Sequence, residues 1–245
     1  MAASEEAQLE PPPAVPAMHR AKVRLGFGLC CAGLAVALVA ELGTLIAPLF
    51  VAPSGMEWLQ KDQPQMTLAH TVLGVIVEIA LVVGWFSLYL VPHAQRWRQT
   101  CTWLLLLAGC DFVMLSAQLL SSDKSLVASA ELIGSALGWV EMWMIAVLAA
   151  EAAESAERPD ITNQTEVTGR LIIWGGFLWL AAQIWLFDPN QWPAAEPEPN
   201  SFGSLLGIAA VVMSLFVWIR GVLFCAGLAV AYSSTGDPSQ PEAPA

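Results

Sequence analysis

Residues 126–150 read LVASAELIGSALGWVEMWMIAVLAA, a run of 25 residues in which Glu131 and Glu141 are the only charged side chains. At ~1.5 Å per residue such a helix is ~37 Å long, enough to cross the ~30 Å hydrocarbon core of a bilayer. The stretch therefore predicts a transmembrane helix that carries carboxylates. A charge in hydrocarbon is costly unless it is paired, neutralised or wetted.

The same apolar character recurs along the whole chain. Hydrophobic residues make up 56% of the 245 residues and charged residues only 13%, which is typical of a membrane bundle. A window of about 20 residues predicts six spans. They lie at residues 25–48, 68–92, 101–120, 126–150, 168–187 and 203–231. The short connections between most of them favour an all-α bundle of antiparallel neighbours.

Polar segments flank this bundle. Residues 1–23 are rich in proline and acid, and we expect them to form a disordered tail. Residues 233–245 are expected to form a second disordered tail, so the bundle itself covers residues 24–232.

The basic residues predict the orientation. Seven of the ten Lys and Arg residues precede the first span or lie between spans two and three or four and five. Lys61 and Lys124 lie on the opposite side. The positive-inside rule then places both termini in the cytoplasm of a protein of the cell membrane, with the lipid bilayer as its surroundings.

The charges inside the spans are strongly unbalanced. The acids within the predicted spans are Glu41, Glu78, Asp111, Glu131 and Glu141, and Arg220 is the one basic residue away from the span ends, since Arg170 lies at the start of its span. If all six were ionised, the membrane interior would carry a net charge of about −4. Protons, cations, water or hydrogen bonds must therefore compensate some of them.

Distances along the helices predict the depth of each acid. Glu41 and Glu131 fall near the outer leaflet, where water solvates them. Glu78 and Asp111 each lie about ten residues from a span end, or ~15 Å, which places both at the midplane. If their helices face each other, the two carboxylates share a proton or hold a cation between them.

Glu141 and Arg220 are expected nearer the inner leaflet. Each lies about fifteen residues from the outer end of its span. The two could form an ion pair that acts as an inner gate, or the long Arg220 side chain could extend to the headgroups without meeting Glu141.

Two functions are consistent with these acids. The first is permeation or coupling linked to protons or small cations, because carboxylates accept and release both. The second is a membrane scaffold or accessory subunit, in which neutral acids hydrogen-bond across helices. Partners for the second are available at Ser116, Gln118, Ser129, Ser135, Gln183 and Ser214.

Small residues indicate where helices could approach one another. Gly134 and Gly138 form one GxxxG motif, and Gly203 and Gly207 form another. Such motifs permit close crossings within the chain, or contacts in a homo-oligomer or a larger membrane complex.

Enzymatic motifs are not found. The sequence lacks HExxH, GxSxG and phosphate-binding loops, and its three histidines are too far apart for a multi-histidine metal site or bis-histidine haem ligation. We therefore expect no enzymatic activity, no catalytic residue, no metal centre and no cofactor. The net charge of −11 argues against nucleic-acid binding.

Overall fold

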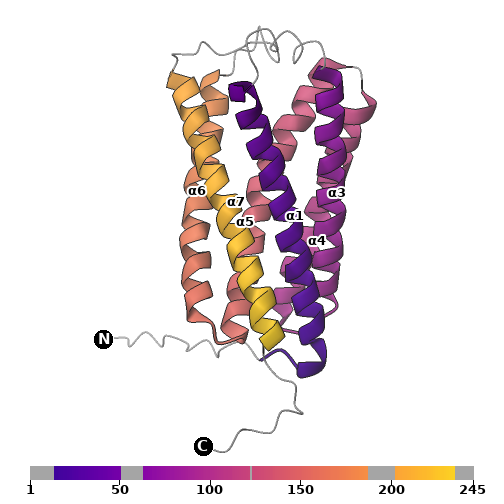
Figure 1. The fold of residues 1–245 in the computed structure, drawn as a ribbon, viewed down its shortest axis with the longest axis vertical. Coiled ribbons are helices and arrows are strands. Elements are labelled where there is room, and N and C mark those ends of the chain that lie inside the picture. Colours follow the sequence, from indigo (N-terminus) through magenta and orange to yellow (C-terminus); the bar gives the residue numbers. More distant parts are fainter. Residues whose placement is uncertain (1–13, 51–62, 122, 187–201, 235–245) are drawn as a thin grey trace, which may run out of the picture.

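The computed structural model describes residues 14–50, 63–121, 123–186 and 202–234. All regular structure in these residues is helical, and it comprises six helices, each long and apolar enough to cross a membrane (Figure 1). They are α1 (Ala17–Phe50), α3 (Gln63–Tyr89), α4 (Gln95–Leu120), α5 (Lys124–Ser155), α6 (Pro159–Leu186) and α7 (Phe202–Ser234). The predicted all-α bundle of six spans is confirmed.

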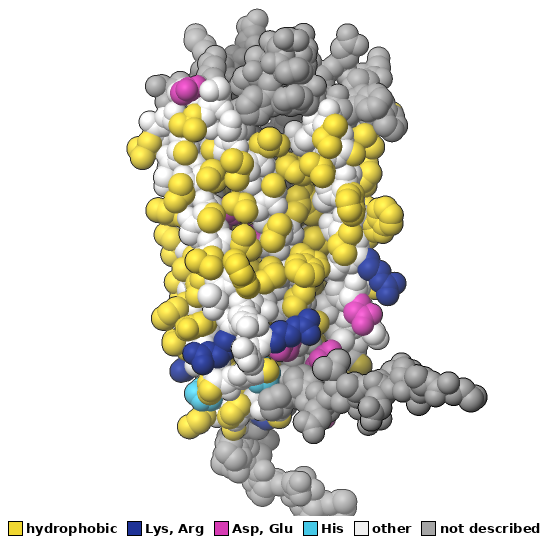
Figure 2. Space-filling view, turned by 180° about the vertical axis from the view of Figure 1, so that it is seen from behind, with side chains coloured by type: hydrophobic (Ala, Val, Ile, Leu, Met, Phe, Trp, Pro, Cys, Tyr) yellow, Lys and Arg dark blue, Asp and Glu magenta, His cyan; other side chains and the backbone are white. Residues whose placement is uncertain are grey.

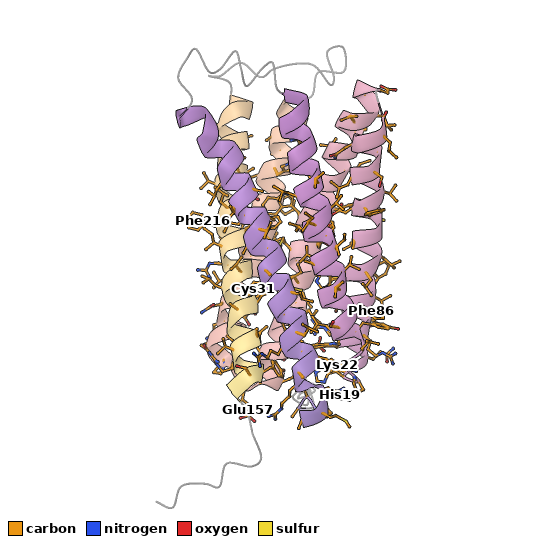
Figure 3. All side chains as sticks on the ribbon, turned by 45° about the vertical axis from the view of Figure 1, so that its right-hand side comes forward. His19, Lys22, Cys31, Phe86, Glu157 and Phe216 are labelled. Atoms are coloured by element: carbon orange, nitrogen blue, oxygen red, sulfur yellow. The ribbon has the colours of Figure 1, made fainter. Side chains whose placement is uncertain are left out.

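The helices form a closed ring. Each packs against the next along the chain, and α7 packs against α1 and contacts α5. The first residue of α1, Ala17, and the last of α7, Ser234, lie at the same end of the bundle, here called the inner end (Figure 1). His19, Lys22 and Glu157 also lie toward this end in Figure 3.

The outer surface of the bundle suits a lipid environment. Hydrophobic side chains cover the middle of the face in Figure 2, whereas the Lys and Arg side chains visible there lie toward the inner end. Phe86 of α3 and Phe216 of α7 point away from the bundle and are more than half exposed (Figure 3). Exposed apolar side chains over most of the helix length indicate contact with lipid rather than water.

Several helices are longer than the predicted spans, mainly at the inner end. Residues 17–23, which we assigned to the N-terminal tail, form the first turns of α1. α5 continues through polar residues to Ser155, and the chain then turns at Glu157, whose φ is 55°. α6 begins at Pro159, whose fixed φ suits a first helical position. A hydropathy window detects only the apolar part of a helix, so it misses polar ends that remain helical.

α1 and α3 cross at close range through two glycines. A Cβ atom added to Gly26 would lie 2.5 Å from Leu88 Cγ and 2.9 Å from the carbonyl oxygen of Gly84. A Cβ atom added to Gly84 would lie 2.9 Å from the carbonyl oxygen of Gly26. The backbones therefore touch, and this crossing tolerates no larger residue without a shift. A Cβ atom on Gly28 meets no atom within 4 Å.

Polar contacts at the inner end join the α3–α4 connection to α5. His93 Nε2 lies 3.0 Å from Ser155 Oγ. The Ser155 hydroxyl donates to the carbonyl oxygen of Glu151, so it can accept a hydrogen bond from the His93 N–H. The Trp97 ring packs edge-on against His93. Burial lowers the pKa of His93 below its ordinary range, so the neutral ring is favoured in this contact.

We predict that Gly26→Ala destabilises the protein and that Gly28→Ala does not. The first change forces overlap at the α1–α3 crossing, which costs ~1–3 kcal/mol in packed interiors. The second adds a methyl group in open space, so it should leave stability unchanged or slightly higher. Thermal unfolding in detergent measures both, and equal effects of the two changes would contradict the crossing.

We also predict that His93 contributes to the pH dependence of stability. The unfolded histidine binds a proton below about pH 6.5, whereas the folded one resists protonation. The free energy of unfolding of the wild type, relative to that of His93→Gln, should therefore fall as the pH is lowered from about 7.5 to about 5.5. The acids are the same in both proteins, so the difference between the two free energies of unfolding reports the contribution of His93 alone. A constant difference would exclude this contribution.

Candidate functional site

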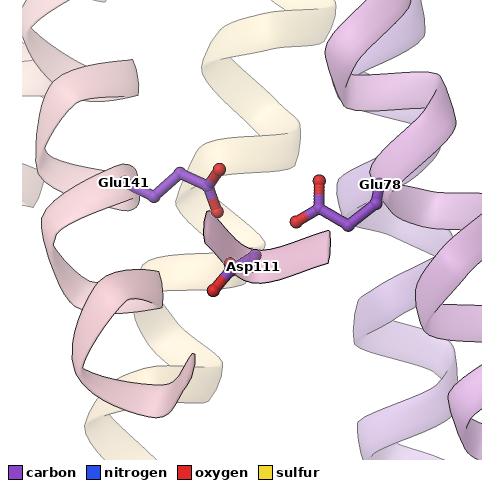
Figure 4. A group of neighbouring side chains, drawn as sticks. All are labelled: Glu78, Asp111 and Glu141. Carbon is purple, nitrogen blue, oxygen red and sulfur yellow. The ribbon is translucent and has the colours of Figure 1, made fainter. Parts of the chain in front are cut away.

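Three carboxylates from three consecutive helices meet inside the bundle (Figure 4). Glu78 comes from α3, Asp111 from α4 and Glu141 from α5, and one carboxylate oxygen of each lies within 4.8 Å of the other two. Glu78 and Glu141 are 8% and 7% exposed, and Asp111 is half-buried. We call Glu78, Asp111 and Glu141 the acid cluster.

The length of each helix explains why these three residues meet. Glu78 lies 11 residues from Tyr89, Asp111 lies 16 from Gln95, and Glu141 lies 14 from Ser155, all counted to the inner ends of their helices. At ~1.5 Å per residue these separations are ~16, 24 and 21 Å, which places the three acids at similar depths.

The structure thus moves Glu141 from the predicted inner tier into the middle tier. The prediction counted Glu141 from the outer end of span 126–150. Nine residues separate Glu141 from the inner end of that span, close to the ten that separate Asp111 from residue 101, so the two acids belong at one depth. Sequence reasoning therefore paired Glu78 with Asp111 and missed the third member of the cluster.

The ion pair expected between Glu141 and Arg220 is not formed in the described part of the structure. Arg220 is half-buried in α7, and no ion pair joins it to Glu141 in the described residues. The remaining acids predicted near the outer leaflet, Glu41 and Glu131, lie in α1 and α5, but their side chains fall outside the described part of the structure.

The buried oxygens of the acid cluster lack hydrogen-bond partners. Glu78 Oε2, Asp111 Oδ1 and Glu141 Oε1 are each shielded from solvent and accept or donate no hydrogen bond among the described residues. Two of the serines considered as partners bond to their own helices instead, Ser116 to the carbonyl oxygen of Phe112 and Ser129 to that of Ser125. Hydrogen bonding between helices therefore does not explain these atoms.

No basic side chain balances the charge of the cluster. Across residues 14–50, 63–121, 123–186 and 202–234, no Lys or Arg forms an ion pair with any of its three acids. Three ionised carboxylates at this separation would carry a charge of about −3 in a medium of low dielectric constant, where like charges repel strongly. Protons or a bound cation must supply the missing positive charge.

The surroundings of the cluster differ between its two sides. Toward the inner end, fully buried apolar side chains follow on the same three helices. They are Leu81, Trp85 and Leu88 on α3, Leu104 and Ala108 on α4, and Ile145 and Leu148 on α5. These seven residues form what we call the inner plug. Toward the outer end, Met114, Leu115 and Gln118 of α4 are only half-buried.

This asymmetry limits access to the acids. Side chains of the inner plug are at most 3% exposed, so no water-filled passage borders them in this state. The side chains of α3 residues 63–71 lie outside the described part of the structure. The described residues therefore close the cluster toward the inner end.

The four GxxxG glycines differ in their surroundings. A Cβ atom added to Gly134 would lie 3.9 Å from Asp111 Oδ1, so this glycine lines the acid cluster. Cβ atoms added to Gly138 or Gly207 would meet nothing within 4 Å. Gly203 lies in α7, but its surroundings are outside the described part of the structure.

No known protein family, curated protein or solved structure is significantly similar to this chain. Its function is therefore inferred from the fold and the acid cluster.

We predict that neutralising one member of the cluster, by Glu78→Gln, Asp111→Asn or Glu141→Gln, stabilises the fold by ~1–3 kcal/mol at alkaline pH. Each change removes a buried charge that no described residue compensates. The gain should shrink as the pH falls, because protons then neutralise the wild-type acids. Unfolding in detergent across pH measures it, with Glu154→Gln, an exposed acid on α5, as the control.

Pairs of these substitutions should stabilise by less than the sum of the single changes, because removing one charge relieves the other two. The opposite result, a loss of stability in every variant at all pH values, would show that the acids hold the helices together.

Proposed function

We propose that this chain is a multi-pass membrane protein in which the acid cluster binds and releases protons or small cations, as part of permeation or coupling across the membrane. One observation carries the proposal. Three carboxylates from three helices, two of them buried and one half-buried, lie within 4.8 Å of one another, and no basic side chain pairs with them in the described residues. Ionisable groups placed inside membrane bundles commonly mark ion or proton pathways.

The chemistry of carboxylates suits this role. A carboxylate can exchange a proton for a cation without a change in the backbone, and neighbouring carboxylates titrate as one unit. Because the cluster is buried, its free energy depends strongly on whether a proton or a cation neutralises the carboxylates, since an uncompensated charge is costly there. Uptake or release of a single proton or ion would therefore alter the forces between α3, α4 and α5.

Coupling fits the observed state better than an open channel does. The inner plug is filled by tightly packed apolar side chains, which leave no continuous wet passage toward the inner end. Transfer to that side requires the plug to move. The acids would be reached from the outer side in this state and from the inner side after the movement, which is the usual logic of alternating access.

The positive-inside rule places the inner end of the bundle in the cytoplasm, with the cytoplasmic membrane as the location. The Lys and Arg side chains gathered toward that end support this orientation (Figure 2).

A scaffold or accessory subunit is the second candidate. Gly138 on α5 and Gly207 on α7 leave open space at their Cα atoms, so a helix of another copy or another protein could approach closely there. In that case the acid cluster contributes to the fold or to assembly, and nothing crosses the membrane.

Proton flux into liposomes distinguishes the two candidates. Purified protein is reconstituted with a trapped pH-sensitive dye. The flux is driven in one set of liposomes by a potassium gradient with valinomycin, and in another by a divalent cation trapped inside, because neutral exchange of protons for a cation does not respond to a membrane potential. We expect wild type to acidify the lumen faster than empty liposomes, and Glu78→Gln or Glu141→Gln to abolish the difference. Glu154→Gln should behave as wild type.

The scaffold candidate predicts a different result. Wild type would show no flux at any pH, with protons or with added cations, and would migrate as a larger complex when extracted from its own membrane.

A further inference from the structure

The spacing of the acid cluster fits a single metal ion. Three carboxylate oxygens, one from each residue, lie within 4.8 Å of one another. That limit admits the oxygen separations of a site with calcium–oxygen distances of about 2.3–2.6 Å, and also those of a smaller ion with shorter metal–oxygen distances. The spacing therefore allows one metal ion, and the ligand atoms must indicate which class of metal it is.

The ligand atoms indicate the class of metal. The group is made of carboxylates alone, with no histidine or cysteine among its members. Hard oxygen ligands suit Ca²⁺, Mn²⁺ and Mg²⁺, whereas copper and zinc favour imidazole and thiolate. The second carboxylate oxygens of the same residues, or water, can complete the six or more ligands that Ca²⁺ requires.

The orientation of the side chains is a second and independent observation. Glu78 and Glu141 are each more than nine-tenths buried, and Figure 4 shows their carboxylates pointing toward each other across the space beside Asp111. Each of the three has a buried oxygen without a hydrogen-bond partner among the described residues. Buried polar atoms are almost always satisfied, so these three indicate an occupant that binds to oxygen.

Other titratable groups facing the cluster do not replace such an occupant. The buried thiol of Cys30 on α1 interacts electrostatically with Glu141, but it is not among the possible ligands. Arg220 of α7 is half-buried and forms no ion pair with the described acids. The central part of α6, residues 171–186, contains no titratable residue.

Charge balance sets the number of protons exchanged. With all three acids protonated the cluster is neutral. A divalent cation that displaces two protons leaves two carboxylates and one carboxylic acid around a charge of +2, and the site is neutral again. A monovalent cation would displace one proton. Both exchanges avoid a net charge in the low-dielectric interior, but the divalent ion gains the stronger attraction.

We propose that the acid cluster binds one divalent cation of the class that prefers oxygen ligands, such as Ca²⁺ or Mn²⁺, and that it releases two protons as the cation binds. This inference rests on the proposed function and names the ion for the same site.

The test uses Mn²⁺ as the probe and the full chain in detergent. Loss of the electron paramagnetic resonance signal of free Mn²⁺ measures binding, and Ca²⁺, Zn²⁺ and Na⁺ are added as competitors. Calorimetry in two buffers with different heats of ionisation counts the protons released. Glu78→Gln, Asp111→Asn and Glu141→Gln are compared with Glu154→Gln.

We expect one Mn²⁺ per chain, displaced by Ca²⁺ but not by equal amounts of Na⁺, with about two protons released per ion. Each cluster substitution should weaken binding by ~10- to 100-fold or more, since even residues that only support a metal ligand have effects of this size. Mn²⁺ should raise the unfolding temperature of wild type and Glu154→Gln only. A cooperative unfolding transition in each variant, with or without this shift, shows that the variant is folded.

Absence of saturable binding, or equal binding by wild type and the three cluster variants, would overturn the metal site. Binding without proton release would overturn the exchange. If Mn²⁺ does not bind but liposomes show proton flux that depends on Glu78, the proposed function stands with protons alone. If Mn²⁺ binds as expected but neither protons nor cations cross the liposomes, the site stands and the proposed transport does not.

Discussion

Three like charges placed within 4.8 Å of one another inside an apolar bundle are the constraint on which the rest of this structure depends. Packing alone cannot remove it, because burial strengthens the repulsion. No ion pair from the described residues relieves it, and each of the three acids keeps a buried oxygen without a hydrogen-bond partner among those residues. The folded state is therefore complete only when protons or a cation occupy the space between Glu78, Asp111 and Glu141. Binding and folding of this region are linked.

The described side chains pack tightly on the inner side of the acid cluster. Close contact of α1 and α3 at Gly26 and Gly84, together with the buried side chains of the inner plug, makes the inner half the firmly packed part. The acids lie at its edge. Binding or release of a proton or cation would first change the forces where α3, α4 and α5 meet, next to the tightly packed inner plug. Bundles built in this way can switch between discrete arrangements because packed interiors deform poorly.

The sequence predicted the class of fold well because the signal is long and local. Each span is a run of apolar residues, and the number of spans and their antiparallel order follow from it. Some helix ends were harder to predict, because polar residues such as those in 17–23 continue α1 without contributing to hydropathy. The midplane positions of Glu78 and Asp111 were predicted from residue counts, but Glu141 was misplaced because its depth was counted from the outer end of its span.

The directions in which side chains point could not be predicted from the sequence. Whether Glu141 faces Asp111 or Arg220 depends on the rotation of α5 and α7, and no local pattern fixes that rotation. The same holds for the glycines: Gly26 meets Gly84, whereas Gly28, two residues later, meets nothing. A count of distance from the inner end of each helix, applied to all acids inside spans, would have grouped the three members of the cluster.

Infrared difference spectroscopy of the carboxyl groups tests the central claim most directly, because protonated and ionised carboxyls absorb at separate frequencies. Spectra of wild type are recorded as Ca²⁺ is added or the pH is raised, and the same is done for Glu78→Gln and Glu141→Gln. The account predicts that wild type loses the band of buried protonated carboxyls and gains carboxylate bands, and that both variants show a smaller change. A wild-type spectrum that responds to neither cation nor pH, or that matches the variants, would contradict an exchangeable occupant in the acid cluster.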